Sequence, residues 1–260
     1  YGIAGNGRAS AHLQAYLRLL KVPYKLWYRR LLATNCSLNC VASLHPGLAP
    51  EAALGRCTAV FVLIADGAIA KFISANPFLK TKTLIHFSGS LNLKGVRAMH
   101  PFMPLSERTL SLGEYRRIPF AMDRGVSLKE LVPEFTNPVF SINKEEKKLY
   151  HALCALGANL PVLLWQKALR DLSGKFGIPR GTVQRYFQAS LDNFRENPGR
   201  ALTGPISRKD VTTVAADIKA LGKDPFAEVY SVFAKLALVP QQSTVCLKRP
   251  KAYGATNENN

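Results

Sequence analysis

The sequence predicts an α/β fold with a doubly wound sheet in its N-terminal half and an all-α fold in its C-terminal half. Three observations support this: a glycine-rich turn after the first apolar residues, apolar runs that alternate with helical patterns up to residue 140, and helical patterns alone beyond it. Such alternation is typical of a sheet with helices on both faces. We therefore expect domains at 1–140 and 141–245 and a flexible tail at 246–260.

The apolar residues 2–4 end at a turn that reads Gly5-Asn6-Gly7-Arg8-Ala9-Ser10. Gly5 and Gly7 fit the first two positions of the dinucleotide-binding fingerprint of Rossmann folds, and the small Ser10 fits the third. The first glycine permits a tight turn, and the second lets the backbone approach a pyrophosphate. A helix at 8–20 would then point its N-terminus at the anion. The alternative is a glycine turn before an ordinary helix.

The second predicted strand, residues 24–28, ends at Arg29 and Arg30. A site for NAD places an acidic residue about 20 residues after the glycines to bind the ribose 2′-hydroxyl, and no acid lies near this point. A carboxylate there would repel a 2′-phosphate, whereas guanidinium groups bind it with charge-assisted hydrogen bonds. We therefore predict NADP(H) as the cofactor. The alternative is two solvated arginines at a strand end.

Further strands are predicted at 58–65, 82–87, 96–100 and 118–122. Because ligands of doubly wound sheets bind at the carboxyl ends of the strands, the polar residues that follow these strands are candidates for the site. We expect Ala65, Asp66 and Ser88 to contact the cofactor. Along the same edge we expect Gly5, Arg29 and His100.

A long helix is predicted from Lys144 to about residue 173. Helical spacing gives it two stripes, one of leucines from Leu149 to Leu163, which we expect in the core, and one that carries His151, Asn159 and Gln166. The polar stripe suits one wall of a cleft, although a subunit contact or satisfied polar groups in the core would give the same pattern. Pro161 removes one helical hydrogen bond and predicts a kink near Asn159.

Three more helices are predicted at about 179–196, 208–221 and 225–238. Ser207 to Asp210 matches the spacing of a capping box for the second of them. The helices at 144–173 and 225–238 are apolar on two sides, which is more surface than one small bundle can bury. We therefore expect a homodimer formed through this domain.

The chain carries a formal net charge of +18, which is typical of nucleic-acid binders, but its Lys and Arg are scattered and no nucleic-acid motif accompanies them. No stretch reaches the 18 or so uninterrupted apolar residues of a membrane span, so we expect no membrane partner. Cys36 and Cys40 have no second pair to complete a zinc site, and we predict no metal. The cytosol is the expected compartment.

These features together resemble NADP oxidoreductases with a Rossmann-like domain and a helical second domain similar to that of pyrroline-5-carboxylate reductase. More closely, they resemble a bacterial subfamily of that group with largely uncharacterised function. The resemblance covers almost the whole chain and is carried by the order and spacing of these segments: Gly5 to Arg8, Asp66, His86 to Gly89, His100-Pro101, Tyr150-His151 with Asn159, and Ala201 to Pro205 with Arg208 and Asp210. It implies a nucleotide domain, a helical domain that often dimerises, and a cleft between them.

Hydride transfer needs a donor of a proton or hydrogen bond beside the nicotinamide. The candidates are His100, His151 and Ser88, with Asn159 nearby on the helix. Related hydroxyacid dehydrogenases use a helix lysine, but Lys167 falls outside the polar stripe. Thr203, Gly204 and Arg208 can hold a substrate carboxylate. We therefore predict an NADP(H)-dependent oxidoreductase that acts on a small anionic imine or carbonyl substrate in the interdomain cleft. The alternatives are a non-catalytic NADP(H) sensor or scaffold and a basic nucleic-acid binder.

Overall fold

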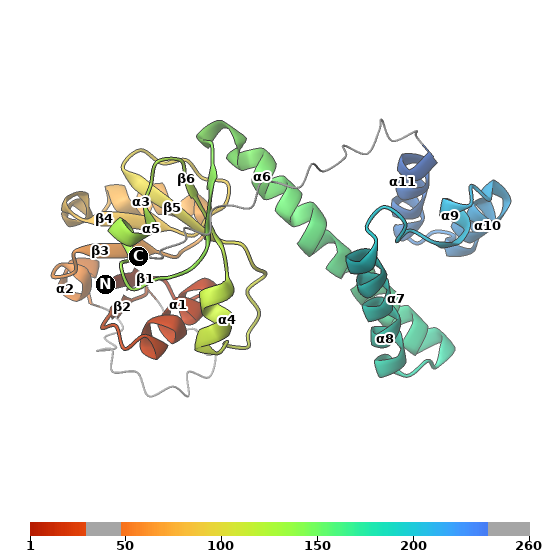
Figure 1. The fold of residues 1–260 in the computed structure, drawn as a ribbon, viewed down its shortest axis with the longest axis horizontal. Coiled ribbons are helices and arrows are strands. Elements are labelled where there is room, and N and C mark those ends of the chain that lie inside the picture. Colours follow the sequence, from red (N-terminus) through yellow and green to blue (C-terminus); the bar gives the residue numbers. More distant parts are fainter. Residues whose placement is uncertain (30–47, 239–260) are drawn as a thin grey trace, which may run out of the picture. The chain divides into compact units, whose positions relative to one another are not determined.

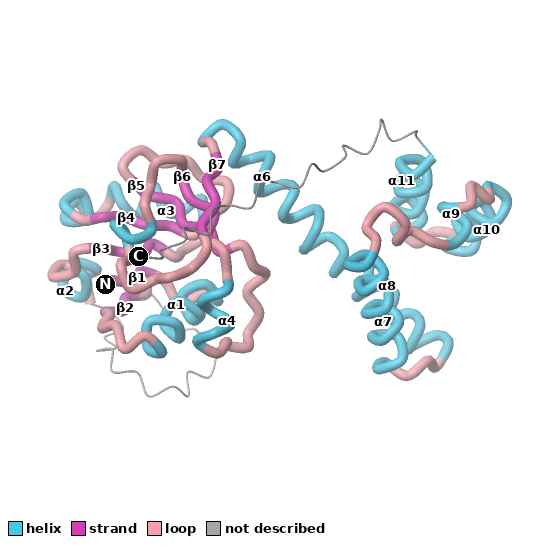
Figure 2. Tube along the Cα trace, viewed as in Figure 1, coloured by secondary structure: helices cyan, strands magenta, loops and turns pink. Residues whose placement is uncertain are grey.

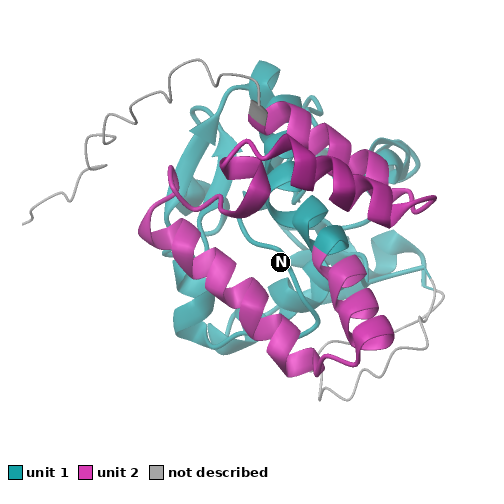
Figure 3. Ribbon diagram, turned by 90° about the vertical axis from the view of Figure 1, so that its right-hand side faces the viewer, with its two compact units in different colours: residues 1–164 teal, residues 165–260 magenta. Residues whose placement is uncertain are grey.

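The computed structural model describes residues 1–29 and 48–238 (Figure 1). Contacts divide the chain into two compact units, Tyr1–Leu164 and Trp165–Asn260, which Figure 3 colours separately. The division falls inside a helix, α7 (Leu160–Phe176). Arg30, Cys36, Cys40 and the predicted tail at 246–260 lie outside the described residues.

The first unit is built on one sheet, whose seven described strands follow the order β2-β1-β3-β4-β5-β6-β7. Neighbouring strands are parallel except β5 and β6, which are antiparallel. The predicted α/β fold is therefore confirmed, with one reversal near the end of the sheet. The strands are β1 Gly2–Ala4, β2 Lys25–Trp27, β3 Ala59–Val62, β4 Thr83–His86, β5 Val96–Pro101, β6 Phe120–Asp123 and β7 Val139–Ile142.

Helices flank this sheet and then make up the rest of the described chain (Figure 2). The first unit has α1 Arg8–Leu19, α2 Pro50–Leu54, α3 Asp66–Ser74, α4 Leu112–Arg117, α5 Leu128–Leu131 and α6 Lys147–Cys154, with short 3₁₀ turns at η1 Pro77–Thr81 and η2 Lys144–Glu146. A π-helical turn, η3 Ala155–Asn159, links α6 to α7. The second unit continues with α8 Arg180–Glu196, α9 Gly204–Ser207, α10 Val211–Leu221 and α11 Phe226–Leu238. The predicted all-α C-terminal region is confirmed.

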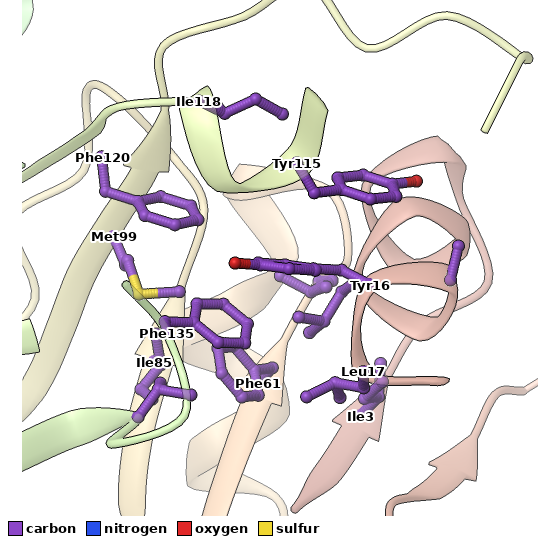
Figure 4. Close-up of a cluster of buried hydrophobic side chains, with 14 of the residues drawn as sticks. Ile3, Tyr16, Leu17, Phe61, Ile85, Met99, Tyr115, Ile118, Phe120 and Phe135 are labelled. Carbon is purple, nitrogen blue, oxygen red and sulfur yellow. The ribbon is translucent and has the colours of Figure 1, made fainter. Parts of the chain in front are cut away.

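Two apolar layers hold the sheet between its helices. Side chains alternate across β3, so that Phe61 packs on one face while Val60 and Val62 pack on the other. Figure 4 shows the first layer, in which Tyr16 of α1 stacks on Tyr115 of α4 with ring centroids 5.0 Å apart. This packing fixes where α1 lies on the sheet, and so where its N-terminus meets the carboxyl edge of the strands.

The long helix departs from α-helical geometry at the position that Pro161 predicts. Leu160 N–H donates to the Ala155 carbonyl, five residues back, which is the hydrogen bond of a π turn. Proline has no N–H, so the carbonyl of Gly157 loses its helical donor. The sequence predicts a kink here, and the structure has a widened, π-helical turn at the position of the missing hydrogen bond.

The leucine stripe of this helix is exposed, so its predicted place in the core is wrong for the single chain. Leu149, Leu153 and Leu163 are 63%, 57% and 54% exposed. The side chains that face the sheet are instead Lys147, which is buried, and Tyr150, which is partly buried. By length and composition, Lys144–Phe176 is the one helix among the described residues that is long and apolar enough to cross a membrane.

A second correction concerns the predicted capping box at Ser207 and Asp210. Helix α10 begins at Val211, and Asp210 itself is its N-cap, accepting a hydrogen bond from Thr213 N–H at 3.1 Å. Ser207 instead ends the short helix α9. Lys209 lies between the two helices with a φ of +57°, and this left-handed residue breaks the helix that the spacing predicts.

In the second unit, Lys167 forms ion pairs with Asp171 on its own helix and with Asp224, which lies between α10 and α11. Its ammonium also lies 5.7 Å from the ring centre of Phe226. Lys167 therefore joins α7 to the start of α11 and has a structural role here.

Candidate active site

The glycine turn is shaped by a close approach between two strands. Gly5 has a φ of +129°, and a Cβ atom there would lie 2.1 Å from the carbonyl oxygen of Leu63, which follows β3. Its N–H donates to the Trp27 carbonyl at the end of β2 at 2.8 Å. Only glycine fits both the conformation and the space. By contrast, a Cβ at Gly7 would meet nothing within 4 Å, so the surface above the turn is open.

Ser10 occupies the third fingerprint position as a buried side chain. Its hydroxyl donates to the Gly5 carbonyl at 2.7 Å and accepts from the Gln14 amide at 3.0 Å, which ties the first turn of α1 to the glycine turn. No side chain of the described residues caps α1, and its first turn carries no acid. The helix N-terminus with its free N–H groups is therefore suited to an anion. Asn6 and Ala9 are partly buried here, and Arg8 is exposed.

The sheet order brings the predicted edge residues into one row. β2, β1, β3, β4 and β5 are consecutive parallel neighbours, so their carboxyl ends share one edge. In spatial order, that edge carries Arg29, Gly5, Asp66, Ser88 and His100. Arg29 is exposed, and its predicted companion Arg30 lies outside the described residues. Residues far apart in sequence are thus aligned as the sequence predicts.

In the middle of this row, the Ser88 hydroxyl donates to the Asp66 carboxylate at 2.5 Å. Asp66 is the first residue of α3, and Ala65 is the residue directly before that helix. The Ser88 oxygen also accepts from Leu91 N–H at 3.1 Å. The pair therefore holds the loop after β4 against the start of α3.

At the far end of the row, His100 meets the helix α6. Its Nδ1 lies 2.7 Å from the Tyr150 hydroxyl, and the two rings pack edge to face. A Cβ at Gly89 would lie 3.0 Å from His151 Cδ2 and 3.2 Å from the His100 ring. Glycine at this position therefore lets two histidines close in on the Ser88 loop. The structure brings together Ser88, His100 and His151, and adds Tyr150.

His86 on β4 and His100 on β5 are both held in the neutral form. Burial, and next the neighbouring His151, lower the pKa of His100 to about 4. Burial, and next the Lys147 ammonium, lower the pKa of the fully buried His86 to about 4. Burial, and then the Cys154 thiol, raise the pKa of Tyr150. At neutral pH the cluster thus presents an uncharged imidazole and an uncharged phenol.

Other predicted site residues are not part of this cluster. Asn159 is exposed at the end of the π turn, outside the group formed by Ser88, His100, Tyr150 and His151. Thr203, Gly204 and Arg208 belong to the second unit, at the two ends of α9, where Arg208 N–H donates to the Gly204 carbonyl. Gly204 has a φ of +80°.

Sequence reasoning missed Tyr150 as a site residue and overlooked Lys147. We looked for a lysine on the polar stripe and considered Lys167, whereas the helix presents Lys147 and Tyr150, three residues apart, to the sheet. Lys147 lines a small cavity with Ser88, Gly89, His100 and Tyr150. The spacing of a lysine and a tyrosine on one helical face was the available signal.

The fold resembles that of NAD(P)-dependent oxidoreductases. A protein from Bacteroides fragilis, provisionally named an NADP oxidoreductase, matches with a TM-score of 0.68 and 17% identity over 91% of this chain and 96% of that one. A pyrroline carboxylate reductase from Plasmodium falciparum with NADP bound matches with a TM-score of 0.54 and 14% identity, over 91% and 94%. An imine reductase from Myxococcus stipitatus in complex with NADP⁺ matches with a TM-score of 0.60 and 11% identity, over 91% and 92%.

A family model described as a domain of unknown function (DUF2520) matches residues 123–237. No curated protein sequence matches the chain. The resemblance predicted from the sequence is therefore confirmed as a similarity of fold, and it leaves the reaction open.

Replacement by alanine should have very different effects on stability at the two glycines of the turn. Gly5→Ala should destabilise the protein by at least about 3 kcal/mol, because it combines left-handed strain with a clash against the Leu63 carbonyl. Gly7→Ala should change stability by no more than about 1 kcal/mol. If the turn cradles a pyrophosphate, Gly7→Ala should nevertheless weaken NADPH binding about tenfold or more. Urea unfolding and fluorescence titration measure both, and NADPH binding unchanged by Gly7→Ala would contradict the cradle.

The two neutral histidines predict an acid-sensitive fold. His86 and His100 have folded-state pKa values of about 4, below the ordinary 6.5, so the unfolded chain binds more protons between these limits. Their contribution is complete above about pH 6.5 and is lost as the pH falls toward 4, with a slope of up to about 1.4 kcal/mol per pH unit for each group. Urea unfolding across this range measures the slope, and NMR titration assigns it. Ordinary pKa values for both rings would refute the prediction.

Proposed function

We propose that this chain is an NADP(H)-dependent oxidoreductase that acts on a small anionic imine or carbonyl compound. The observation that carries the proposal is the single row of residues along one sheet edge, from the glycine turn at Gly5 to the His100–Tyr150 pair. A turn suited to a pyrophosphate and a neutral donor pair at one edge are what hydride transfer requires.

The residues present fit a phosphorylated dinucleotide. The open space above Gly7 and the uncapped N-terminus of α1 suit the pyrophosphate, and Ser10 holds that turn in place. Exposed Arg29 follows β2, where an NADP site needs a cation and an NAD site needs an acid. The cofactor, when bound, supplies the hydride. The chain's residues bind it, orient it and hold the proton.

His100 and Tyr150 are the groups that we assign to hydrogen-bond donation at the reacting atom. With a pKa of about 4, roughly one His100 in a thousand is protonated at pH 7, so it acts as a neutral hydrogen-bond donor rather than as a strong acid. When the Tyr150 O–H donates to Nδ1, the neutral ring carries its proton on Nε2, and this N–H can donate to developing negative charge on the substrate. His151 and Ser88 are further donors. A protonated imine is already electrophilic and needs little more from the protein.

Thr203, Gly204 and Arg208 complete the proposal as the groups for a substrate carboxylate. They offer a hydroxyl, a backbone N–H and a guanidinium, which together suit a planar anion. The guanidinium would favour an anionic substrate over a neutral one.

Two alternatives have a specific observation behind them. A non-catalytic NADP(H) sensor or scaffold is favoured by the exposure of Asn159 and by the ion pair with Asp123 that engages Lys147, the lysine lining the cavity beside the pair. A nucleic-acid binder is favoured by the net charge of +18. Steep loss of affinity for DNA or RNA with salt, together with indifference to NADPH, would support the latter.

We also propose that the chain forms a homodimer through its helices. The exposed leucines of α6, η3 and α7 make an apolar stripe that a soluble chain rarely leaves uncovered. A membrane is a poor cover, because the start of the same helix packs on the sheet through Lys147 and Tyr150, and the polar His151 and Asn159 interrupt its apolar stretch. A second copy supplies an identical stripe by twofold symmetry.

NADPH should bind more tightly than NADH. A charge-assisted phosphate contact contributes about 1.5–3 kcal/mol, so Arg29→Ala should weaken NADPH about tenfold or more and leave NADH nearly unchanged. Lys25→Ala, at the opposite end of the same strand, is the matched control. Calorimetric titration of both cofactors measures the difference, and equal affinities in the parent protein would sink this prediction.

The parent protein should oxidise NADPH when offered a panel of cyclic imines and keto acids that carry a carboxylate. Loss of NADPH fluorescence measures turnover. Tyr150→Phe removes one hydroxyl from the donor pair and should lower kcat about a hundredfold, while NADPH binding stays near the parent value. Tight NADPH binding with no turnover across the panel would favour the sensor instead.

Light scattering should give twice the 28.6 kDa mass of the chain. Leu153→Glu places a charge in the leucine stripe and should shift the protein toward monomer. Lys71→Glu, an exposed change on α3, is the control. A parent protein that stays monomeric at micromolar concentrations would argue against the dimer.

A further inference from the structure

A buried ion pair lies behind the His100–Tyr150 pair. Lys147 is the first residue of α6 and Asp123 is the last residue of β6. The Lys147 Nζ lies 2.6 Å from Asp123 Oδ1, and the two side chains are only 5% and 7% exposed. This contact is an ion pair that lacks hydrogen-bond geometry. The Lys147 Nζ–H group donates its hydrogen bond to the Leu91 carbonyl instead, at 2.9 Å.

This ion pair joins four segments of the first unit. Asp123 Oδ2 accepts from Ala98 N–H of β5 at 3.3 Å, while Lys147 reaches the loop after β4 through Leu91. The end of β6, the middle of β5, the Ser88 loop and the first turn of α6 therefore meet at two charged side chains. The donor pair lies on the same elements. His100 is on β5, Tyr150 is on α6, and β6 is the neighbour of β5 in the sheet.

Stability alone is a weak reason for such a pair. Removing two charges from water costs nearly as much as their attraction returns, and well-packed apolar residues often serve equally well. An ion pair with two further hydrogen bonds also fixes the positions of the two side chains and of the backbone segments that carry them. Tyr150 lies one helical turn after Lys147, so the place of its hydroxyl depends on where that first turn is held.

We propose that Lys147 and Asp123 are positioning residues, which fix the first turn of α6 so that the Tyr150 hydroxyl meets His100. The proposal rests on the proposed function for its catalytic meaning, but the geometry it describes exists without substrate. A displacement of about 1 Å would break a 2.7 Å hydrogen bond and can cost a hundredfold in rate.

The Lys147 charge has a second effect on the same cluster. His86 Nδ1 accepts from Ser88 N–H at 3.1 Å, and its buried Nε2 has no hydrogen-bond partner among the described residues. A proton there would place a second buried cation beside Lys147. The ionisable groups that act on His86, element by element, are Asp66 on α3, His100 on β5, Asp123 on β6 and Lys147 on α6. Within the same cluster, His151 acts on His100 and Cys154 acts on Tyr150.

The test uses the full chain and separates position from stability. Lys147→Met alone leaves the Asp123 carboxylate buried without its cation and should destabilise the protein. Lys147→Met with Asp123→Leu removes both charges and should recover most of the lost thermal stability. Lys147→Arg keeps the charge with a different reach. Lys148→Met, an exposed neighbour on the same turn, is the matched control.

The primary readout is the ¹⁵N signal of His100 Nδ1, assigned by its response to Tyr150→Phe. In the folded double variant and in Lys147→Arg, this signal should move toward that of Tyr150→Phe, and kcat should fall more than tenfold with little change in KM. Lys148→Met should match the parent in every measurement. NADPH affinity should stay near the parent value in all folded variants.

A His100 signal and a kcat equal to the parent's in both folded variants would overturn the positioning role, whatever the melting temperatures are. If the double variant does not fold, Lys147→Arg alone decides by the same signal. A parent protein that binds no NADPH would instead defeat the proposed function, and the ¹⁵N signal would still test whether the ion pair positions Tyr150.

Discussion

The carboxyl edge of the sheet depends on one close approach, that of the Gly5 backbone to the strand beside it. Gly5 N–H donates to Trp27, and Leu63 N–H donates to the Ala4 carbonyl at 2.7 Å, so three strands end at one level. No side chain fits between Gly5 and the Leu63 carbonyl. Helix α1 leaves from this point, and its packing on the sheet follows from it.

Those parts of the site that depend on short-range rules could be predicted from the sequence. The glycine turn is recognisable because φ > 0 and close packing demand glycine at a defined place. The row from Arg29 to His100 follows from the rule that parallel strands share a carboxyl edge, once the strands are recognised by their apolar runs. Pro161 predicts a disturbed helix for the same local reason.

The contacts made across the fold could not be predicted in this way. His100 and Tyr150 are 50 residues apart, and their meeting depends on the rotation of α6. A periodicity of about 100° per residue from Leu149 to Leu163, continued across the expected kink, assigns the leucines to the buried face, because apolar side chains usually face the core. The structure turns Lys147 inward, where it pairs with the Asp123 carboxylate at the end of β6. A charged partner 24 residues upstream leaves no periodic trace in the helix itself.

The π turn at Ala155–Asn159 has a consequence for how this helix can change in evolution. A π turn is equivalent to one extra residue in an α-helix, and each residue of an α-helix advances the side chains by about 100°. Deleting one residue here would restore regular α-helical winding and leave the side chains on either side of the turn pointing in nearly the same directions. The same deletion in a regular turn of the helix would rotate the side chains beyond it by about 100°. The π turn is therefore the place where this helix can change its length by one residue with the least effect on its faces.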